Sequence, residues 1–221
     1  MKVIVTTGPS YEPIDDVRRL TNFSTGELGV LLANQLAREG HEVFCLRGVS
    51  ATHPGALEGC QHLPFTTNDD LLAQLTTLGR AHDVGAVFHV AALCDFKLRH
   101  VEDERGQNLQ SPKIDSRIAG LTLHLEPARK IIGDLRGLFP RAIITGWKYE
   151  LAGSRADALA KAWRQIRENK TDACVLNGRA WGSGFALCTS PELIRESDSK
   201  PALVQQLARW LVTTSGAQQR S

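Results

Sequence analysis

The sequence predicts an α/β protein built around an open, mostly parallel sheet with helices on both faces. Short apolar runs alternate along the chain with segments whose apolar residues recur at helical spacing. The run at 84–92 is almost continuously apolar, as expected of a parallel strand that is buried on both faces. These patterns are typical of a Rossmann-like fold, and 221 residues suffice for a single domain spanning 1–221.

The expected elements follow one another in a regular order. Strands are predicted at 3–5, 41–46, 60–65, 84–92, 121–125, 141–145 and 173–176. Helices are predicted at 24–38, 68–80, 156–168 and 201–212, where the apolar residues fall on one face. The first helix is expected to begin at Ser24, because Ser24-Thr-Gly-Glu27 has the pattern of a capping box.

One segment interrupts this alternation. Residues 97–120 are polar and show no periodicity, and the alternating strand 121–125 follows them. A polar segment of this length inside a compact domain is typical of a functional flap or arm. We therefore expect residues 97–125 to form a flap within the domain, with a disordered insertion as the alternative.

Composition limits the kinds of partner. The net charge is +2 and basic residues form no long run, so neither nucleic acid nor an anionic membrane is an expected partner. No apolar run is long enough to span a membrane and the N-terminus has no signal-segment pattern, so a cytoplasmic location is expected. Five scattered cysteines indicate reduced thiols, and the seven histidines have no metal-ligand spacing, so no metal held by protein side chains is expected.

Four stretches follow predicted strands, at 6–29, 91–95, 146–150 and 177–178. The carboxyl ends of parallel strands meet at one edge of a sheet, where ligands bind in open α/β folds. The first stretch lacks the glycine fingerprint of dinucleotide-binding loops. It offers instead Gly8 and Ser10 for contact with phosphates, Arg18 for charge, and Asn22 just before a helix N-terminus that favours anions. A plain turn at Gly8 and solvated arginine side chains remain the alternatives.

The stretch "TTGPSYEPIDDVRRLTNFSTGELG" at 6–29 resembles the signature of the phosphopantothenate–cysteine ligase family of coenzyme A biosynthesis. The resemblance continues through "AALCDF" at 91–96, "PKIDS" at 112–116, "ITGWKYE" at 144–150 and "NKTDACVLN" at 169–177. It therefore covers nearly the whole chain. The chain resembles the free-standing ligase, without the flavin-dependent decarboxylase half of the fused bacterial form.

The resemblance implies a ligase that joins 4′-phosphopantothenate to L-cysteine in two steps. The pantothenate carboxylate first attacks the α-phosphate of CTP or ATP, which releases pyrophosphate and leaves an acyl-nucleotide. The cysteine amine then attacks the acyl carbon and expels the nucleoside monophosphate. Mg²⁺ is expected to arrive with the triphosphate rather than in a protein cage. Members of the family resemble homodimers in which the flap reaches across the interface.

The resemblance also implies roles for the residues that match the family's motifs. Asn22 is expected beside the reacting carboxylate, where a neutral donor stabilises the developing oxyanion. Arg18 is expected to support the loop or a phosphate, and Lys148 to face the phosphates, with a solvated Lys148 as the alternative. The nucleotide and the substrate are expected to contact Gly8, Ser10, Ala91, Ala92, Asp95, Lys113, Trp147 and Asn177.

The chain departs from the family pattern in two places. Many bacterial members have K-I-K-K in the flap, whereas this chain has Lys113-Ile-Asp-Ser116, which leaves the choice between CTP and ATP open. Arg117 is available to supply the missing charge, and Trp147 stands where the family usually has Phe.

Two other functions are weighed against the ligase. The altered flap supports a non-catalytic paralogue that binds a nucleotide or a coenzyme A precursor. The other alternative is an NAD(P)-dependent Rossmann oxidoreductase. Against it, Tyr11 and Tyr149 are the chain's only tyrosines, and neither has a lysine four residues later.

Overall fold

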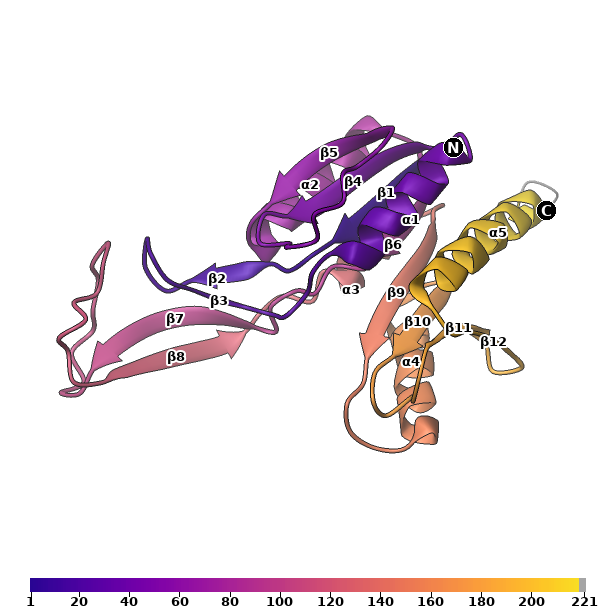
Figure 1. The fold of residues 1–221 in the computed structure, drawn as a ribbon. Coiled ribbons are helices and arrows are strands. Elements are labelled where there is room, and N and C mark those ends of the chain that lie inside the picture. Colours follow the sequence, from indigo (N-terminus) through magenta and orange to yellow (C-terminus); the bar gives the residue numbers. More distant parts are fainter. Residues whose placement is uncertain (219–221) are drawn as a thin grey trace.

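A central sheet of eight strands organises the protein, and the computed structural model describes residues 1–218 (Figure 1). The strand order is β12-β11-β10-β9-β6-β1-β4-β5. Six strands are parallel: β1 (Lys2–Thr7), β4 (Glu42–Gly48), β5 (Cys60–Phe65), β6 (Val84–His89), β9 (Ile143–Tyr149) and β10 (Ala173–Asn177). The strands β11 (Phe185–Ser190) and β12 (Leu193–Ser197) add an antiparallel edge that the sequence patterns did not predict. The mostly parallel sheet is confirmed.

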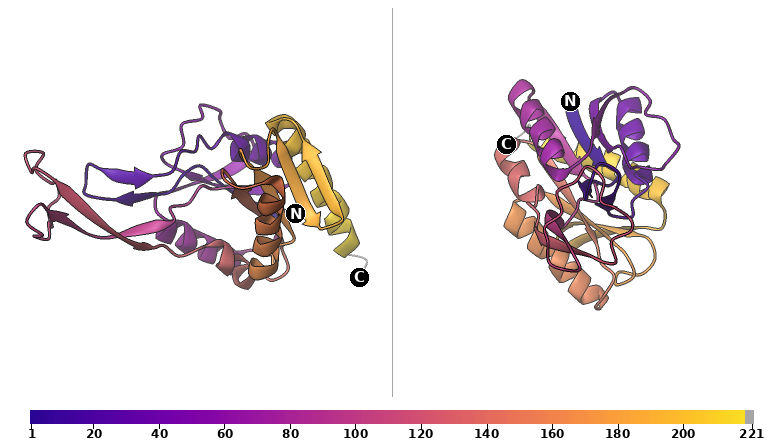
Figure 2. Two further views of the ribbon diagram at one scale, coloured as in Figure 1. Left: turned by 90° about the horizontal axis from the view of Figure 1, so that it is seen from below. Right: turned by 90° about the vertical axis from the view of Figure 1, so that its left-hand side faces the viewer.

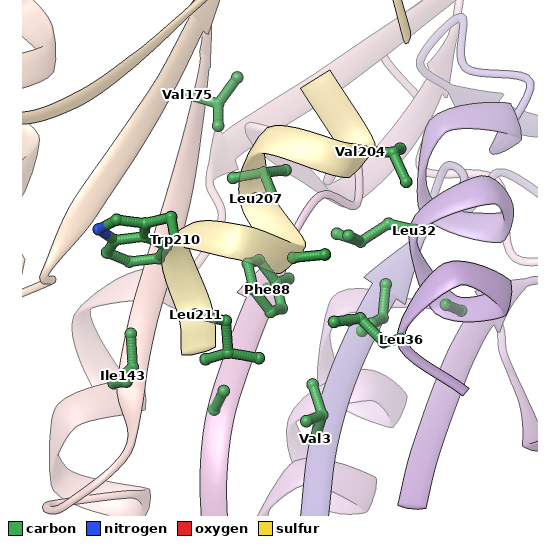
Figure 3. Close-up of a cluster of buried hydrophobic side chains, with 14 of the residues drawn as sticks. Val3, Leu32, Leu36, Phe88, Ile143, Val175, Val204, Leu207, Trp210 and Leu211 are labelled. Carbon is green, nitrogen blue, oxygen red and sulfur yellow. The ribbon is translucent and has the colours of Figure 1, made fainter. Parts of the chain in front are cut away.

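Helices cover both faces of this sheet, as predicted. The helices α1 (Glu27–Arg38) and α5 (Lys200–Gln218) contact each other on one face, where Leu32, Leu36 and Leu207 surround Val3 and Phe88 (Figure 3). The other face carries α2 (Asn68–Ala81), α3 (Ile132–Leu138) and α4 (Arg155–Asn169). Within the described residues, no helix combines the length and the apolarity needed to cross a membrane.

The strand pleat explains why one apolar run supplies two cores. On β1, Val3 and Val5 pack in the cluster under α1 and α5, whereas Ile4 packs in the cluster under α2 and α3. All three side chains are fully buried. Burial of one such aliphatic side chain contributes about 1.5–3 kcal/mol to the transfer free energy. A strand that is apolar at every position is therefore stabilised only where helices cover both faces.

Two hairpins extend from the sheet in the same direction (Figures 1 and 2). The shorter one pairs β2 (Tyr11–Pro13) with β3 (Arg19–Thr21), inside the loop that follows β1. The longer one, which we call the arm, pairs β7 (Phe96–Asp103) with β8 (Leu121–Pro127). The flap predicted at 97–125 is thus a protruding hairpin and not a disordered insertion. Its first strand was missed because a register shift between Leu98 and His100 breaks the two-residue alternation.

Candidate active site

The strand order places a topological switch point between β1 and β6. From β1 the chain continues to β4 and β5 on one side, and from β6 it continues to β9 and β10 on the other. The loops that follow β1 and β6 therefore diverge at the carboxyl edge of the sheet. Ligands of open α/β proteins bind in the crevice at this point.

A cleft of about 360 Å³ lies at this edge. One wall is the segment 23–29, which includes the first turn of α1, and the floor includes Val90 and Ala92 from the loop after β6. The rest of the lining comes from the ends of β9, β10 and β11 and from the start of α5, which packs beside α1. These elements contribute Trp147, Tyr149, Asn177, Phe185 and Lys200.

The N-terminus of α1 is the main polar feature of the cleft. The helix begins at Glu27, and its N-cap Gly26 has a φ of 78° and makes no side-chain hydrogen bond to the helix. The predicted capping box from Ser24 is therefore wrong: the left-handed turn at Gly26 delays the helix, and Thr25 accepts a hydrogen bond from the Glu27 backbone N–H at 3.3 Å. First-turn N–H groups lack partners within their helix and favour an anion.

Glycines allow this helix to start very close to β1. A Cβ atom on Gly29 would lie 2.2 Å from the Cβ atom of Thr7, so only glycine fits there. The Thr7 hydroxyl donates to the backbone carbonyl of Gly26 at 2.8 Å, which fixes the helix start to the end of the strand. Gly8 also has a φ of 78°, and a Cβ on Gly26 would lie 3.3 Å from its Cα. The glycines of the signature thus bring the helix N-terminus to the sheet edge.

Lys200 and Glu27 form an ion pair at the rim of the cleft. The hydrogen bond from Lys200 is the main reason that the pKa of the Glu27 carboxyl lies below its ordinary value. Lys200 is the first residue of α5, which packs beside α1, so its side chain reaches the first turn of α1. An anion bound at the helix N-terminus would compete with Glu27 for this ammonium group.

Asn22 joins the two loops of the switch point. Its side-chain amide donates to the backbone carbonyl of Leu93 at 2.8 Å, and its side chain is exposed. Asn22 lines a groove of about 350 Å³ that shares Phe23, Ser24 and Thr25 with the cleft. A primary amide has two N–H donors, so the bond to Leu93 orients Asn22 and leaves one donor for a ligand.

A second cavity, of about 120 Å³, lies beyond the end of β6. Ala91 lines this cavity whereas Ala92 lines the cleft, and Asp95 at its edge forms an ion pair with Lys130. His89 also lines it. The His89 ring lies 2.9 Å from the Thr6 hydroxyl, and its burial lowers its pKa to about 4. The imidazole is therefore neutral at physiological pH.

Four predicted site residues thus lie at the cleft or the adjoining groove, namely Asn22, Ala92, Trp147 and Asn177. Gly8 and Ser10 are buried beneath the loops. The Ser10 hydroxyl accepts a hydrogen bond from the Cys94 backbone N–H at 2.8 Å, so it holds the loops together. Lys148 pairs with Leu176, which packs under α4, so it projects from the face of the sheet opposite Trp147.

Arg18 and Lys113 lie away from the cleft, where the arm meets the short hairpin. Arg18 donates to the backbone carbonyl of Ile114 at 2.7 Å, and the Asp15 carboxylate accepts from the Ile114 backbone N–H at 3.2 Å. The strand β3 separates Arg18 from Asn22, and four residues of extended chain span about 13 Å. The structure therefore does not bring Arg18 and Asn22 of one chain to one ligand atom.

Sequence reasoning missed several residues that line the cleft. The signature contains Ser24, Thr25 and Glu27, but the capping-box pattern suggested that they only begin the helix. Tyr149 lies in the stretch 146–150, but no sequence pattern marks it as a residue of the cleft. Lys200 precedes a predicted helix near the C-terminus, and no local pattern connects it with the first loop. Only the packing of α5 beside α1 could reveal it.

Comparison with known proteins gives one family. The profile described as the DNA/pantothenate metabolism flavoprotein C-terminal domain matches residues 1–209. A protein from Thermococcus kodakarensis, named coenzyme A biosynthesis bifunctional protein CoaBC, is 31% identical over 185 residues, which are 82% of this chain and 42% of that protein. The chain spans about half the length, or less, of the curated relatives that it matches.

Solved structures share the fold. The crystal structure of the DNA/pantothenate metabolism flavoprotein from Streptococcus pneumoniae has a TM-score of 0.83 at 22% identity, and the match covers 97% of this chain and 99% of that one. A Cab2 variant in complex with phosphopantothenate-cysteine has a TM-score of 0.75 at 18% identity, covering 100% of this chain and 89% of its own. At these identities the likeness establishes the architecture.

Proposed function

Because the chain belongs to the DNA/pantothenate metabolism flavoprotein C-terminal domain family, we propose that it is a ligase that joins 4′-phosphopantothenate to L-cysteine. One observation carries the proposal: the signature 6–29 forms a wall of the cleft at the switch point, with the N-terminus of α1 facing into it. The names of the relatives agree with this reaction, since one is a coenzyme A biosynthesis protein and a structural neighbour holds phosphopantothenate-cysteine.

The proposed reaction proceeds through an acyl-nucleotide. The carboxylate of phosphopantothenate attacks the α-phosphate of CTP or ATP, and pyrophosphate leaves with the electron pair of the broken P–O bond. The amine of cysteine then attacks the acyl carbon, loses a proton and expels the nucleoside monophosphate. Both steps bring anionic groups together, so fixed N–H donors and cations supply most of the stabilisation.

We place the triphosphate at the N-terminus of α1 with Lys200 as its counter-charge. The helix N–H groups and the ammonium group favour an anion, and Trp147 and Tyr149 line the same cleft with faces on which a base could stack. Glu27 is the one carboxylate among the described residues that line the cleft. This donor set suits Mg²⁺, which binds one or two carboxylates together with substrate phosphates. When bound, Mg²⁺ would neutralise phosphate charge.

Asn22 is the residue that we assign to the acyl centre. Its amide is oriented by the Leu93 carbonyl, at the boundary between the groove and the cleft. A neutral N–H donor there can stabilise the oxyanion of the second step without repelling the substrate carboxylate. Ala91, Ala92 and Asp95 remain proposed contacts to the nucleotide and to the pantothenate moiety. Phosphate contacts of Gly8, Ser10 and Lys148 remain predictions.

We also propose that the ligase is a homodimer. Lys113 and Arg18 are far from the cleft of their own chain, so they can serve a reaction centre only if the arm reaches another molecule. The arm exposes three large apolar side chains, Phe96, Leu121 and Leu125, as an interface would. Light scattering at micromolar concentration should give the mass of a dimer, and a monomer there would refute this part of the proposal.

A non-catalytic paralogue that binds nucleotide is the second candidate. It is favoured by one contact in the arm: Arg117, which is available to supply the charge missing from the flap, forms an ion pair with Asp115 at 2.7 Å. Its charge is therefore partly neutralised within the arm. Only Lys113 of the flap motif remains for a ligand.

A pyrophosphate assay separates the two candidates. The protein is incubated with phosphopantothenate, cysteine and Mg²⁺, together with CTP or ATP in parallel reactions. The ligase proposal predicts pyrophosphate release with at least one nucleotide, and the faster reaction identifies the preferred one. Nucleotide binding without any pyrophosphate release would favour the paralogue. The proposal places the reaction in the cytoplasm, where the five cysteines would remain free thiols.

A further inference from the structure

Three side chains with metal-binding groups gather on one face of the arm. His100 and Glu102 belong to β7, and His124 belongs to β8. The Nε2 atoms of His100 and His124 lie 3.0 Å and 2.9 Å from the two carboxylate oxygens of Glu102. One ligand atom from each residue can be chosen so that all three lie within 4.8 Å of one another.

The hairpin itself produces this arrangement. His100 and Glu102 are two residues apart on one strand, so their side chains share a face. The register shift between Leu98 and His100 inserts one residue into β7, and therefore His100 rather than Arg99 pairs with His124. The two imidazole rings stack with centroids 4.2 Å apart and planes 12° apart, which directs both Nε2 atoms toward the same side.

We propose that His100, Glu102 and His124 bind one divalent transition-metal ion, with Zn²⁺ as the best match. Two imidazole nitrogens and one carboxylate oxygen are a donor set that Zn²⁺ uses, with a fourth position left for water or another ligand. Mg²⁺ prefers oxygen ligands only, so this site is chemically distinct from the one proposed for the nucleotide. The inference does not depend on the ligase activity.

The surroundings of the three residues allow an ion to enter. The side chains of His100, Glu102 and His124 are 26%, 28% and 41% exposed, so they are partly ordered by the hairpin and still reachable from solvent. Without a metal ion, the Glu102 carboxylate can accept a hydrogen bond from each ring. A bound ion would take the place of the two protons that these hydrogen bonds use. It would also link β7 to β8 in a two-stranded hairpin, which by itself has marginal stability.

Calorimetric titration of the full chain with Zn²⁺, combined with metal analysis after gel filtration, tests the proposal. The wild-type protein should retain one Zn²⁺ per chain. His124→Ala and Glu102→Gln should each weaken the affinity by about tenfold or more, because one of three protein ligands is lost. His62→Ala is the matched control, since His62 is exposed on β5 of the central sheet, and it should bind Zn²⁺ as the wild type does.

Three results would overturn the proposal. The first is the absence of stoichiometric Zn²⁺ in the wild-type protein. The second is equal affinity in the wild type and in Glu102→Gln, which keeps the shape of the side chain and serves as the deciding variant if His124→Ala does not fold. An excess of Mg²⁺ should leave bound Zn²⁺ in place, and displacement by Mg²⁺ would contradict the assigned ligands.

Discussion

The side-chain amide of Asn22 donates to the backbone carbonyl of Leu93 at 2.8 Å, across 71 residues of sequence. This contact joins the loop after β1 to the loop after β6 at the point where the two loops diverge. It requires an N–H donor, which a carboxylate lacks. The same amide group therefore orients the residue and is the donor that we assign to the acyl centre.

Replacement of Asn22 by aspartate should separate the two chemical steps. The Asn22→Asp variant loses the donor to Leu93 and places a negative charge where the oxyanion develops, so the second step should slow by about 10²–10³-fold. In single-turnover reactions the acyl-nucleotide should accumulate while pyrophosphate release is affected less. The free energy of unfolding should change by only about 1 kcal/mol, because one exposed hydrogen bond is lost. Equal slowing of both steps would argue against this role.

Lys200 should matter for nucleotide affinity. In Lys200→Gln the ammonium group that faces the first turn of α1 is gone, and the dissociation constant for CTP or ATP should rise about tenfold, or ~1.4 kcal/mol. Titration calorimetry measures the change directly. Lys161→Gln serves as the control, because Lys161 lies on α4 and pairs with Glu150 outside the cleft lining. Equal nucleotide affinities in Lys200→Gln and the wild type would show that Lys200 does not contribute to the nucleotide site.

Two glycines with similar positive φ angles should respond differently to alanine. Gly40 has a φ of 84°, and no atom lies within 4 Å of the position that a methyl group would take there. Gly40→Ala should therefore lower the free energy of unfolding by about 1–2 kcal/mol through backbone strain alone. A methyl group on Gly26 would also meet Ala51 at 3.0 Å, and overpacking should add about 1–3 kcal/mol. Urea unfolding of both variants measures the difference, and equal losses would show that the loops relax freely.

Acid should destabilise the protein through His89. Its pKa is lowered by burial from 6.5 to about 4, so the unfolded chain binds a proton at a pH where the folded protein does not. The contribution of His89 to the free energy of unfolding is therefore fully present above pH 6.5. It declines as the pH falls toward 4, by about 3 kcal/mol over the whole window.

Urea unfolding at several pH values tests this assignment. His89→Asn keeps a polar atom near the Thr6 hydroxyl but cannot titrate in this range, so its stability should fall less steeply between pH 6.5 and 4. Identical slopes in His89→Asn and the wild type would assign the acid sensitivity to other groups.

The sequence patterns predicted the parts of the fold that depend on burial. The parallel strands and four of the helices have apolar residues at regular spacing, and the packing of Val3, Ile4 and Val5 into two cores follows from that spacing. The edge strand β12 was not predicted because its side chains are mostly exposed and show no apolar alternation. The strand β7 was not predicted because the register shift before His100 interrupts the two-residue alternation of its side chains.

The sequence predicted only those features of the candidate site that lie within one segment of the chain. The signature located the cleft wall, but whether Ser24 caps the helix depends on the left-handed turn at Gly26, which the capping pattern conceals. The position of Lys200 depends on how α5 packs beside α1. The distance between Arg18 and Asn22 depends on β3, whose three residues are too few to give a periodic signal.

Omission of cysteine gives the most direct test of the proposed ligase. The protein is incubated with phosphopantothenate, Mg²⁺ and the preferred nucleotide, and the products are followed by mass spectrometry. The ligase proposal predicts pyrophosphate and an acyl-nucleotide in amounts close to that of the enzyme, and addition of cysteine should convert the acyl-nucleotide to phosphopantothenoylcysteine and nucleoside monophosphate. Bound nucleotide that remains intact, with no acyl-nucleotide before cysteine and no product after it, would contradict the proposal.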